Sequence, residues 1–389
     1  MKKYLIFITF LFLPYLSLFP QEESFVINHG PYLQYLTTNE VTIVWTTTTE
    51  GTSWVEFYEE DGSNFYEKER PKIFAASDGL KSIGKIHKVT LTDLKPSTKY
   101  VYRIYSKEVK NRNYRSPVFG KTIATSPRQL QYFTTDKLNR DHTSCVVISD
   151  MHEDASKIGR LLEDVNWDET DFIVSDGDFL SDFDQENDLF VALDTCVDIF
   201  AKEKPLYIVR GNHETRGSIA SELKNYFHFP QNNYYYTFTS GSTLFIVLDG
   251  GEDKPDSDIE YSELVDFDPY RTREVKWLQD LIESEKFKHA DHIIVFNHIP
   301  PFFPNRSAWH GDMEVREKFL PILNNAGIDL MICGHTHRYA FLDRKSGENN
   351  FPIIVMNNNC RMNLTIDSSG IKATTIDINK KVLSQLTFE

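Results

Sequence analysis

Cysteine is scarce in this sequence, which has only four in 389 residues: Cys145, Cys196, Cys333 and Cys360. No two of them have zinc-knuckle spacing, which argues against a structural zinc site built from thiolates. Cys145 and Cys333 lie inside apolar, strand-like runs, where a free thiol behaves as a small hydrophobic side chain. The four cysteines are therefore predicted to be structural, and the sequence leaves their disulfide state open.

Runs of Lys and Arg are also absent, and the formal net charge is −15. An acidic chain without a basic patch repels polyanions, so we expect no nucleic-acid partner. If the substrate is a small phosphorylated molecule, bound metal ions must attract it locally, because the overall field of the protein does not.

Long apolar runs are limited to residues 4–19, which follow Lys2 and Lys3. This run is short for a bilayer span of about 20 residues but suits an export signal. We expect residues 1–21 to be a signal peptide or an N-terminal anchor, with Gln21 near the cleavage point. The protein is predicted to be exported (secreted, periplasmic or on the cell surface), with membrane attachment only through an uncleaved N-terminal segment. The oligomeric state has no signature in the sequence.

Two parts of the chain differ in periodicity. Residues 25–135 alternate or run apolar in short segments rich in β-branched and aromatic residues, which indicates an all-β sandwich. The segment 94–100, which ends in Tyr100, resembles the corner of fibronectin type III-like domains. Residues 142–389 alternate apolar strands with helical patterns and indicate a layered α/β domain. The expected strands are 144–149, 171–175, 205–209, 243–248, 292–296 and 329–333, the expected helices are 156–165, 188–201, 271–286 and 315–325, and the chain returns to strands from about residue 351.

Polar side chains follow five of these strands. They are Asp150 and His152, Asp178, Asn212 with His213 and Glu214, His298, and His335 with His337. In α/β sheets, ligands bind beyond the carboxyl ends of the strands, so we expect these groups to converge. The acidic segment 250–269 has no helical or strand pattern and is expected to be a surface loop or a rim of this site.

The residue types in this set indicate the kind of ion. Imidazole, carboxylate and amide oxygen without thiolate suit Zn, Mn or Fe. Seven candidate ligands are too many for one tetrahedral zinc, whereas two ions that share a carboxylate fit the number. Two such ions would provide an activated hydroxide and a clamp on phosphoryl oxygens.

Each residue also has a structural explanation when it is taken singly. Asp150 could cap a helix, Asp178 and Asn212 could form turns, and His298 could be a buried, hydrogen-bonded histidine. Five such coincidences at five strand ends are needed to explain the whole set, so the joint pattern favours a metal centre.

In this order, the motifs Asp150-x-His152, Gly177-Asp178, Gly211-Asn-His-Glu214, His298 and Gly334-His-x-His337 resemble the calcineurin-like metallophosphoesterase superfamily. With the preceding β-domain, the chain is similar to purple acid phosphatases. The resemblance implies that Asp150, His152 and His337 hold a first metal, that Asp178 bridges, and that Asn212, His298 and His335 hold a second. It further implies that His213 protonates the leaving oxygen or stabilises the transition state, while Glu214 orients its ring.

The sequence departs from purple acid phosphatases at Ser181, where that family has a tyrosine that binds ferric iron. A purple ferric centre is therefore not expected, and Zn, Mn or ferrous iron is favoured. His310 lies in a motif similar to the family's substrate loop, with one residue inserted, and is a candidate phosphate contact or a solvated loop histidine. Arg306 is a second candidate contact, and Arg216 and Arg338 also lie near motifs.

These features predict hydrolysis of a phosphate monoester by in-line attack of a metal-bound hydroxide, with a small phosphorylated substrate. One alternative is a phosphodiesterase or nucleotide hydrolase that uses the same site. Another is a secreted binding module in which the β-domain is the functional part and the metal site is inactive.

Overall fold

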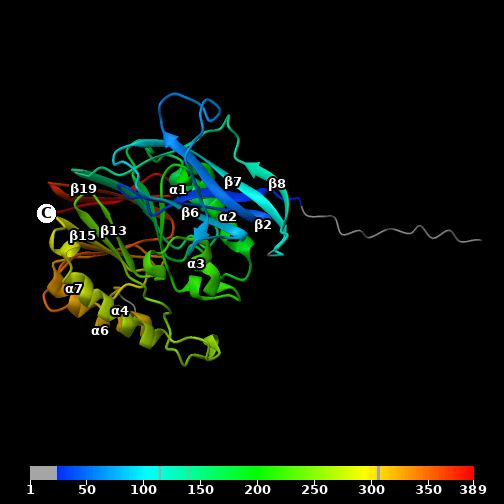
Figure 1. Ribbon diagram of the computed structural model, residues 1–389. Coiled ribbons are helices and arrows are strands. Elements are labelled where there is room, and N and C mark those ends of the chain that lie inside the picture. Colours follow the sequence, from blue (N-terminus) through cyan, green and yellow to red (C-terminus); the bar gives the residue numbers. More distant parts are fainter. Residues whose placement is uncertain (1–23, 114, 139, 305–306) are drawn as a thin grey trace, which may run out of the picture.

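The computed structural model describes residues 24–389 except 114, 139, 305 and 306. The ribbon shows an all-β domain at the N-terminal end and a larger mixed domain that ends at the C-terminus (Figure 1). The predicted export signal at residues 1–21 and the predicted phosphate contact Arg306 lie outside the described residues. Within the described part of the chain, no helix is long and apolar enough to cross a membrane.

The N-terminal domain is a folded sheet organised around one long strand, β2. Its strands are β1 (Ile27–Gln34), β2 (Val41–Glu59), β3 (Lys72–Phe74), β6 (Gly84–Leu91), β7 (Lys99–Asn111), β8 (Val118–Ala124) and β9 (Gln131–Thr134), beside a small ribbon of β4 (Ala76–Ser77) and β5 (Leu80–Lys81). The first half of β2 pairs with β1 and β6, and its second half pairs with β3 and β7, with the change of partners at Gly51. Strand β2 therefore belongs to both layers of the domain.

Large side chains fill the space between these two layers. Trp45 is fully buried, and its indole N–H donates to Ser106 Oγ at 2.9 Å. The hydroxyl of Tyr100 accepts the backbone N–H of Lys95 at 2.9 Å, as expected of a corner tyrosine. The predicted all-β fold of this domain is therefore confirmed.

The second domain contains two six-stranded sheets. The first has the order β12 (Leu206–Val209), β11 (Phe172–Asp176), β10 (His142–Ile148), β19 (Cys360–Asp367), β20 (Gly370–Asp377) and β21 (Val382–Phe388). The second has the order β13 (Tyr236–Ser240), β14 (Thr243–Val247), β15 (His292–Phe296), β16 (Leu330–Cys333), β18 (Ile353–Val355) and β17 (Ala340–Leu342). Strands β10, β11 and β12 are parallel to one another, and so are β14, β15, β16 and β18.

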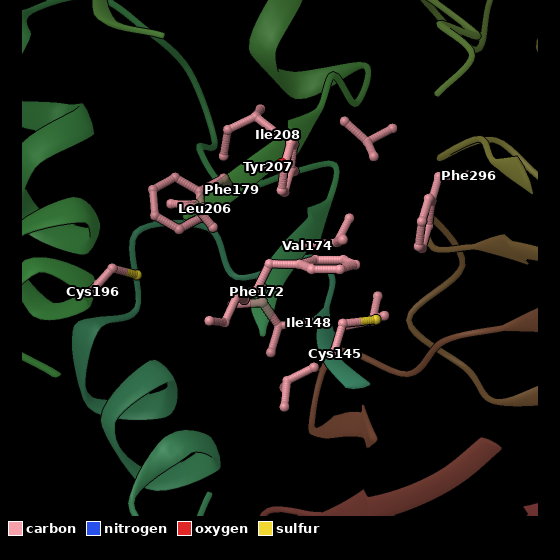
Figure 2. Packing of buried hydrophobic residues seen from close by; sticks show 14 of the residues in the cluster. Cys145, Ile148, Phe172, Val174, Phe179, Cys196, Leu206, Tyr207, Ile208 and Phe296 are labelled. Atoms are coloured by element: carbon pink, nitrogen blue, oxygen red, sulfur yellow. The ribbon is translucent and has the colours of Figure 1, made fainter. Parts of the chain in front are cut away.

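The two sheets pack face to face through aromatic side chains. The ring of Phe172 on β11 lies 5.4 Å from that of Phe238 on β13 and 5.3 Å from that of Phe245 on β14. Figure 2 shows part of this core, with Phe172 and Cys145 on one side and Phe296 on the other. Residues of one face of each sheet therefore share a single apolar layer, as in other stacked sheets.

Helices cover the outer faces of both sheets. They are α1 (Ala155–Leu162), α2 (Glu186–Cys196), α3 (Leu223–Tyr226), α4 (Phe267–Ile282), α5 (Glu285–Lys288), α6 (His310–Lys318) and α7 (Leu320–Ala326). Leu161 of α1 and Leu193 of α2 join the core of the first sheet, whereas Leu278 of α4 and Leu323 of α7 join that of the second. The predicted layered α/β domain is confirmed, and its layers follow the order helices, sheet, sheet, helices (α/β/β/α).

Three local expectations are corrected. The predicted helix 315–325 is two helices that meet at Phe319, because Pro321 has no N–H with which to continue the first helix. The structure contains a strand, β13, that was not predicted. The start of the acidic segment 250–269 is not a surface loop, since Gly251, Glu252 and Asp253 are buried; Asp253 lies next to His335, where a rim of the site was the other expectation.

The two domains share an interface along β1 and β12. The hydroxyl of Tyr32 donates to the carbonyl of Tyr226 at 2.5 Å, and the side-chain amide of Gln34 donates to the carbonyl of Leu206 at 2.6 Å. Tyr32 also belongs to the apolar core of the second domain. Hydrogen bonds and buried apolar surface thus cross the boundary between the domains, and they hold the sandwich against the first sheet.

All four cysteines are free and buried. Burial raises the pKa of the Cys196 thiol to about 12, so this group stays a neutral hydrophobic side chain at physiological pH. The prediction of structural cysteines is confirmed. The sequence left their disulfide state open, and in the structure none of the four is paired.

Candidate metal centre

The polar side chains that follow the parallel strands meet at one edge of the stacked sheets. Asp150 and His152 follow β10, Asp178 follows β11, Asn212 to Glu214 follow β12, His298 follows β15, and His335 with His337 follow β16. Because parallel strands end at the same edge, side chains from both sheets reach a common point.

Potential ligand atoms form two groups. Those of Asp150, His152, Asp178 and His337 lie within 4.8 Å of one another, and those of Asp178, His298 and His335 do the same. The amide oxygen of Asn212 lies 3.0 Å from Nδ1 of His335 and so extends the second group. The structure therefore brings together all seven predicted ligands, and Asp178 belongs to both groups.

The donor atoms of the first group fit a cation between them. Nε2 of His152 lies 3.2 Å from Nε2 of His337, which in turn lies 3.3 Å from Oδ1 of Asp150. Two imidazole lone pairs repel at this distance unless a proton or a metal ion lies between them. Imidazole, carboxylate and amide oxygen suit Zn, Mn or Fe, so the residues fit two ions that share Asp178.

The buried pair of His298 and Asp178 anchors the second group. Nε2 of His298 lies 3.0 Å from Oδ2 of Asp178, and Nδ1 donates to the carbonyl of Asp176 at 2.7 Å. Burial raises the pKa of Asp178, but the neighbouring charge of His298 outweighs it and holds this pKa below its ordinary value. Asp178 is therefore a carboxylate with a fixed partner, as a bridging ligand must be.

Several of these residues have a strained backbone. Asp150, His152, Asp178, His335 and His337 have φ values of +59°, +48°, +50°, +71° and +55°. Left-handed conformations cost energy in non-glycine residues and gather at functional sites. Gly334 is required for a different reason, because a Cβ there would overlap the hydroxyl of Ser149.

The expectation that Glu214 orients the His213 ring is corrected by the structure. Glu214 is buried, and its carboxylate accepts the backbone N–H groups of Asp178 at 2.9 Å, Leu180 at 2.8 Å and Gly211 at 2.7 Å. It therefore ties the turn after β11 to the turn after β12. The ring of His213 is held instead by the carbonyl of Ser181, which lies 2.6 Å from Nδ1.

Glu153 is a residue beside the centre that the sequence analysis did not single out. Its carboxylate accepts the backbone N–H of Ser181 at 2.5 Å and the Ser181 hydroxyl at 2.8 Å. Glu153 thus holds the residue whose carbonyl holds His213. Its place directly after His152 is the one signal in the sequence, because contacts between a side chain and a distant turn leave no spacing pattern.

His310 is engaged away from the seven ligands. Its Nε2 lies 2.8 Å from Oδ1 of Asp268, in a cluster that also contains Glu314. Arg271 lies 2.8 Å from Asp268, and Lys318 pairs with Glu314, so side-chain cations already neutralise this cluster. The position of the His310 ring is therefore set by Asp268, and its predicted role as a phosphate contact stays a prediction.

The structure also places the two other arginines near the motifs. Arg216 forms two hydrogen bonds of 2.9 Å to the buried carboxylate of Glu252, which occupies its guanidinium fork. Arg338 is exposed next to His337. The residue before His310, Trp309, was not singled out from the sequence, yet its ring centroid lies 5.6 Å from that of His335.

Comparison with known proteins places this geometry in a family. A model of the calcineurin-like phosphoesterase family matches residues 143–339, which is half of the chain, and a model of the purple acid phosphatase N-terminal domain matches residues 30–122. Acid phosphatase type 7 of Mus musculus is 27% identical over 82% of this chain and 72% of its own length. Purple acid phosphatase 21 of Arabidopsis thaliana is 23% identical over 66% of this chain and 53% of its own length.

A solved structure has the same fold. The purple acid phosphatase PPD1 from yellow lupin (Lupinus luteus) seeds aligns with a TM-score of 0.64 at 16% sequence identity, over 92% of this chain and 73% of that one. The matched domain makes the chain a hydrolase of phosphate esters, and its fold implies two metal ions. The chain belongs to the calcineurin-like phosphoesterase family and carries the N-terminal domain of the purple acid phosphatases.

Proposed function

We propose that this chain is a phosphomonoesterase of the purple acid phosphatase type that works with two divalent metal ions. The observation that supports this most directly is the position of Asp178 in both ligand groups. A shared carboxylate keeps two ions close together, and a close pair of ions supplies an activated water and a clamp for phosphoryl oxygens.

The proposed ligands divide between the two ions as the groups do. Asp150, His152 and His337 would hold one ion, and Asn212, His298 and His335 the other, with Asp178 between them. We propose Zn, Mn or ferrous iron as the metals. The hydroxyl of Ser181 donates to Glu153, so this position offers no anionic oxygen for ferric iron.

His213 is the proposed group that assists the leaving oxygen. The carbonyl of Ser181 can only accept a hydrogen bond, so Nδ1 of His213 carries a proton and Nε2 is left to face the substrate. The ring lies 4.8 Å from that of His152 and is nearly perpendicular to it, next to the first ligand group. In the imidazolium form, in which both ring nitrogens carry a proton, Nε2 can donate its proton to the departing oxygen or stabilise its charge.

The surroundings disfavour nucleic acids as substrates. Residues 250–269 are acidic, and the cations described there are paired: Arg216 with Glu252, and Lys254 with Glu260. Such a rim disfavours long polyanions such as nucleic acids. We also propose that the protein is exported, which rests on the apolar run at residues 4–19.

Metal analysis of the purified protein, paired with hydrolysis of p-nitrophenyl phosphate and bis(p-nitrophenyl) phosphate before and after chelation, tests the proposed function. We expect about two metals per chain, chelator-sensitive turnover and a preference for the monoester. Preference for the diester would establish the phosphodiesterase alternative. Absence of metal and of turnover after Zn, Mn or Fe is restored would favour a binding module.

A further inference from the structure

A large aromatic side chain stands exposed beside the second ligand group. Trp309 is 48% exposed, and its ring is nearly perpendicular to that of His335, with the centroids 5.6 Å apart. One turn later on α6, Met313 is 41% exposed, and its backbone N–H donates to the carbonyl of Trp309. Trp309 is the residue before α6 and Met313 lies in its first turn, so two exposed apolar side chains stand at the start of this helix, and Trp309 is the one next to the metal centre.

This surface is held by a rigid backbone. The N–H of Trp309 donates to the buried carboxylate of Asp312 at 2.8 Å, and the N–H of Gly311 donates to the carbonyl of Asp253 at 2.9 Å. A Cβ at Gly311 would lie 2.8 Å from the carbonyl oxygen of Glu252, so this turn packs closely against segment 250–253. The backbone that carries the indole is thus held in place beside segment 250–253.

The charge of the neighbouring residues limits what this surface can bind. Asp253 lies beside His335, with its Oδ2 3.9 Å from Nε2 of the ring. Glu252, the residue before Asp253, is fully buried. Arg216 pairs with both of these carboxylates, and Lys254 pairs with Glu260. An ester group with its own negative charge would be repelled here, whereas an uncharged ring would not.

We propose that Trp309 and Met313 form the subsite for the organic group of the substrate, and that the preferred substrates are phosphate monoesters of planar, uncharged alcohols such as phenols. The proposal rests on the phosphomonoesterase function above and adds its substrate class. An aromatic face binds a flat ring through stacking and sulfur contacts in addition to area burial.

Binding of two phosphonates of equal size tests this subsite without turnover. Phenylphosphonate and cyclohexylphosphonate present the same anion, but only the first has a planar ring. Their dissociation constants are measured by calorimetry on the zinc-loaded protein, for the wild type, Trp309→Leu and Trp309→Phe. Tyr66→Leu, at an exposed aromatic of the N-terminal domain, is the matched control.

We expect Trp309→Leu to weaken phenylphosphonate about three- to tenfold, the range of a stacking contact, and to change cyclohexylphosphonate less than twofold. Trp309→Phe and Tyr66→Leu should stay within twofold of the wild type for both. Equal changes for the two phosphonates, no change, or no binding of either would overturn the subsite. Failure of the hydrolytic function would appear separately, as absent turnover of p-nitrophenyl phosphate by a protein that still prefers the planar phosphonate.

Discussion

Among the seven proposed ligands, Asp178 differs from the rest because its carboxylate belongs to both groups. We expect Asp178→Ala to lose both metals and turnover together, whereas His335→Ala should weaken one site first. Metal content per chain and turnover of p-nitrophenyl phosphate are measured on the same samples. His310→Ala is the matched control, since its ring contacts Asp268, and it should keep both metals. Full turnover with normal metal content in Asp178→Ala would refute the bridging role.

His213 should separate chemistry from metal binding. Its Nδ1 is engaged by the carbonyl of Ser181, and the ring supplies no atom to either ligand group, so we expect His213→Ala to keep its metals while kcat falls about 10²- to 10⁴-fold. The loss should be larger for phenyl phosphate than for p-nitrophenyl phosphate, because a poorer leaving group needs the proton more. Loss of metal from this variant would instead give His213 a structural role.

The Glu153 carboxylate should affect the same leaving-group step indirectly, because it holds Ser181, whose carbonyl holds the His213 ring. Removing it in Glu153→Ala frees both the N–H and the hydroxyl of Ser181, so the carbonyl that holds His213 loses its fixed position. We expect kcat to fall about tenfold or more with unchanged metal content, as for other outer contacts of metal sites. Glu153→Gln keeps an acceptor for the Ser181 N–H and should be milder. A rise in KM without a change in kcat would contradict this role.

At the scale of elements, the strand ends were predictable because each ends in a chemically distinct side chain. The strands around Asp150, Asp178 and His298 are short apolar runs, and parallel pairing then determines where their ends meet. The contacts of Glu214 could not be predicted, because a buried carboxylate that accepts three backbone N–H groups leaves no periodic pattern. Pro321 signals a helix break in the sequence, but the apolar spacing of 315–325 favoured the prediction of a single helix.

Glu214 joins the turns after β11 and β12, so its loss should weaken the fold as well as the site. Glu214→Ala leaves three buried N–H groups without their acceptor, and we expect it to lower the free energy of unfolding by about 2–4 kcal/mol. Denaturant unfolding of the metal-free protein measures this effect. Glu214→Gln retains one acceptor oxygen and should lose less. Wild-type stability in both variants would show that these hydrogen bonds do not contribute to the stability of the fold.

At the scale of the whole molecule, the two domains behave as one packed unit. The Tyr102 hydroxyl donates to the carbonyl of Lys202 at 2.7 Å, and the His29 ring stacks on Phe190 with centroids 3.7 Å apart. None of these contacts involves a proposed metal ligand. They could not be read from the sequence, because the pairing of two surfaces depends on shape as well as on composition. The sandwich therefore packs against the second domain without supplying a ligand, and all the proposed ligands come from the second domain.

This interface should make stability depend on pH through His228. Its Nδ1 lies 3.1 Å from the Thr42 hydroxyl, and its ring stacks on Tyr35 at 5.1 Å. Burial, with a smaller contribution from the charge of Lys88, lowers the pKa of His228 to about 4. This folded value lies below the ordinary value of 6.5, so the unfolded chain takes up the proton first as the pH falls. The stabilisation is complete above pH 6.5 and is lost progressively between pH 6.5 and pH 4.

At pH 5 the loss from His228 alone should be about 2 kcal/mol, from 1.36 kcal/mol per pH unit. His228→Gln can still hydrogen-bond to Thr42 but cannot titrate, so its free energy of unfolding should fall less than that of the wild type between pH 7.5 and pH 5. Denaturant unfolding of the metal-free proteins at both pH values gives the two differences. His289→Gln, at a side chain that is 76% exposed, should keep the wild-type pH dependence. If His228→Gln loses as much stability in acid as the wild type, the acid sensitivity originates elsewhere and the domain interface is not its source.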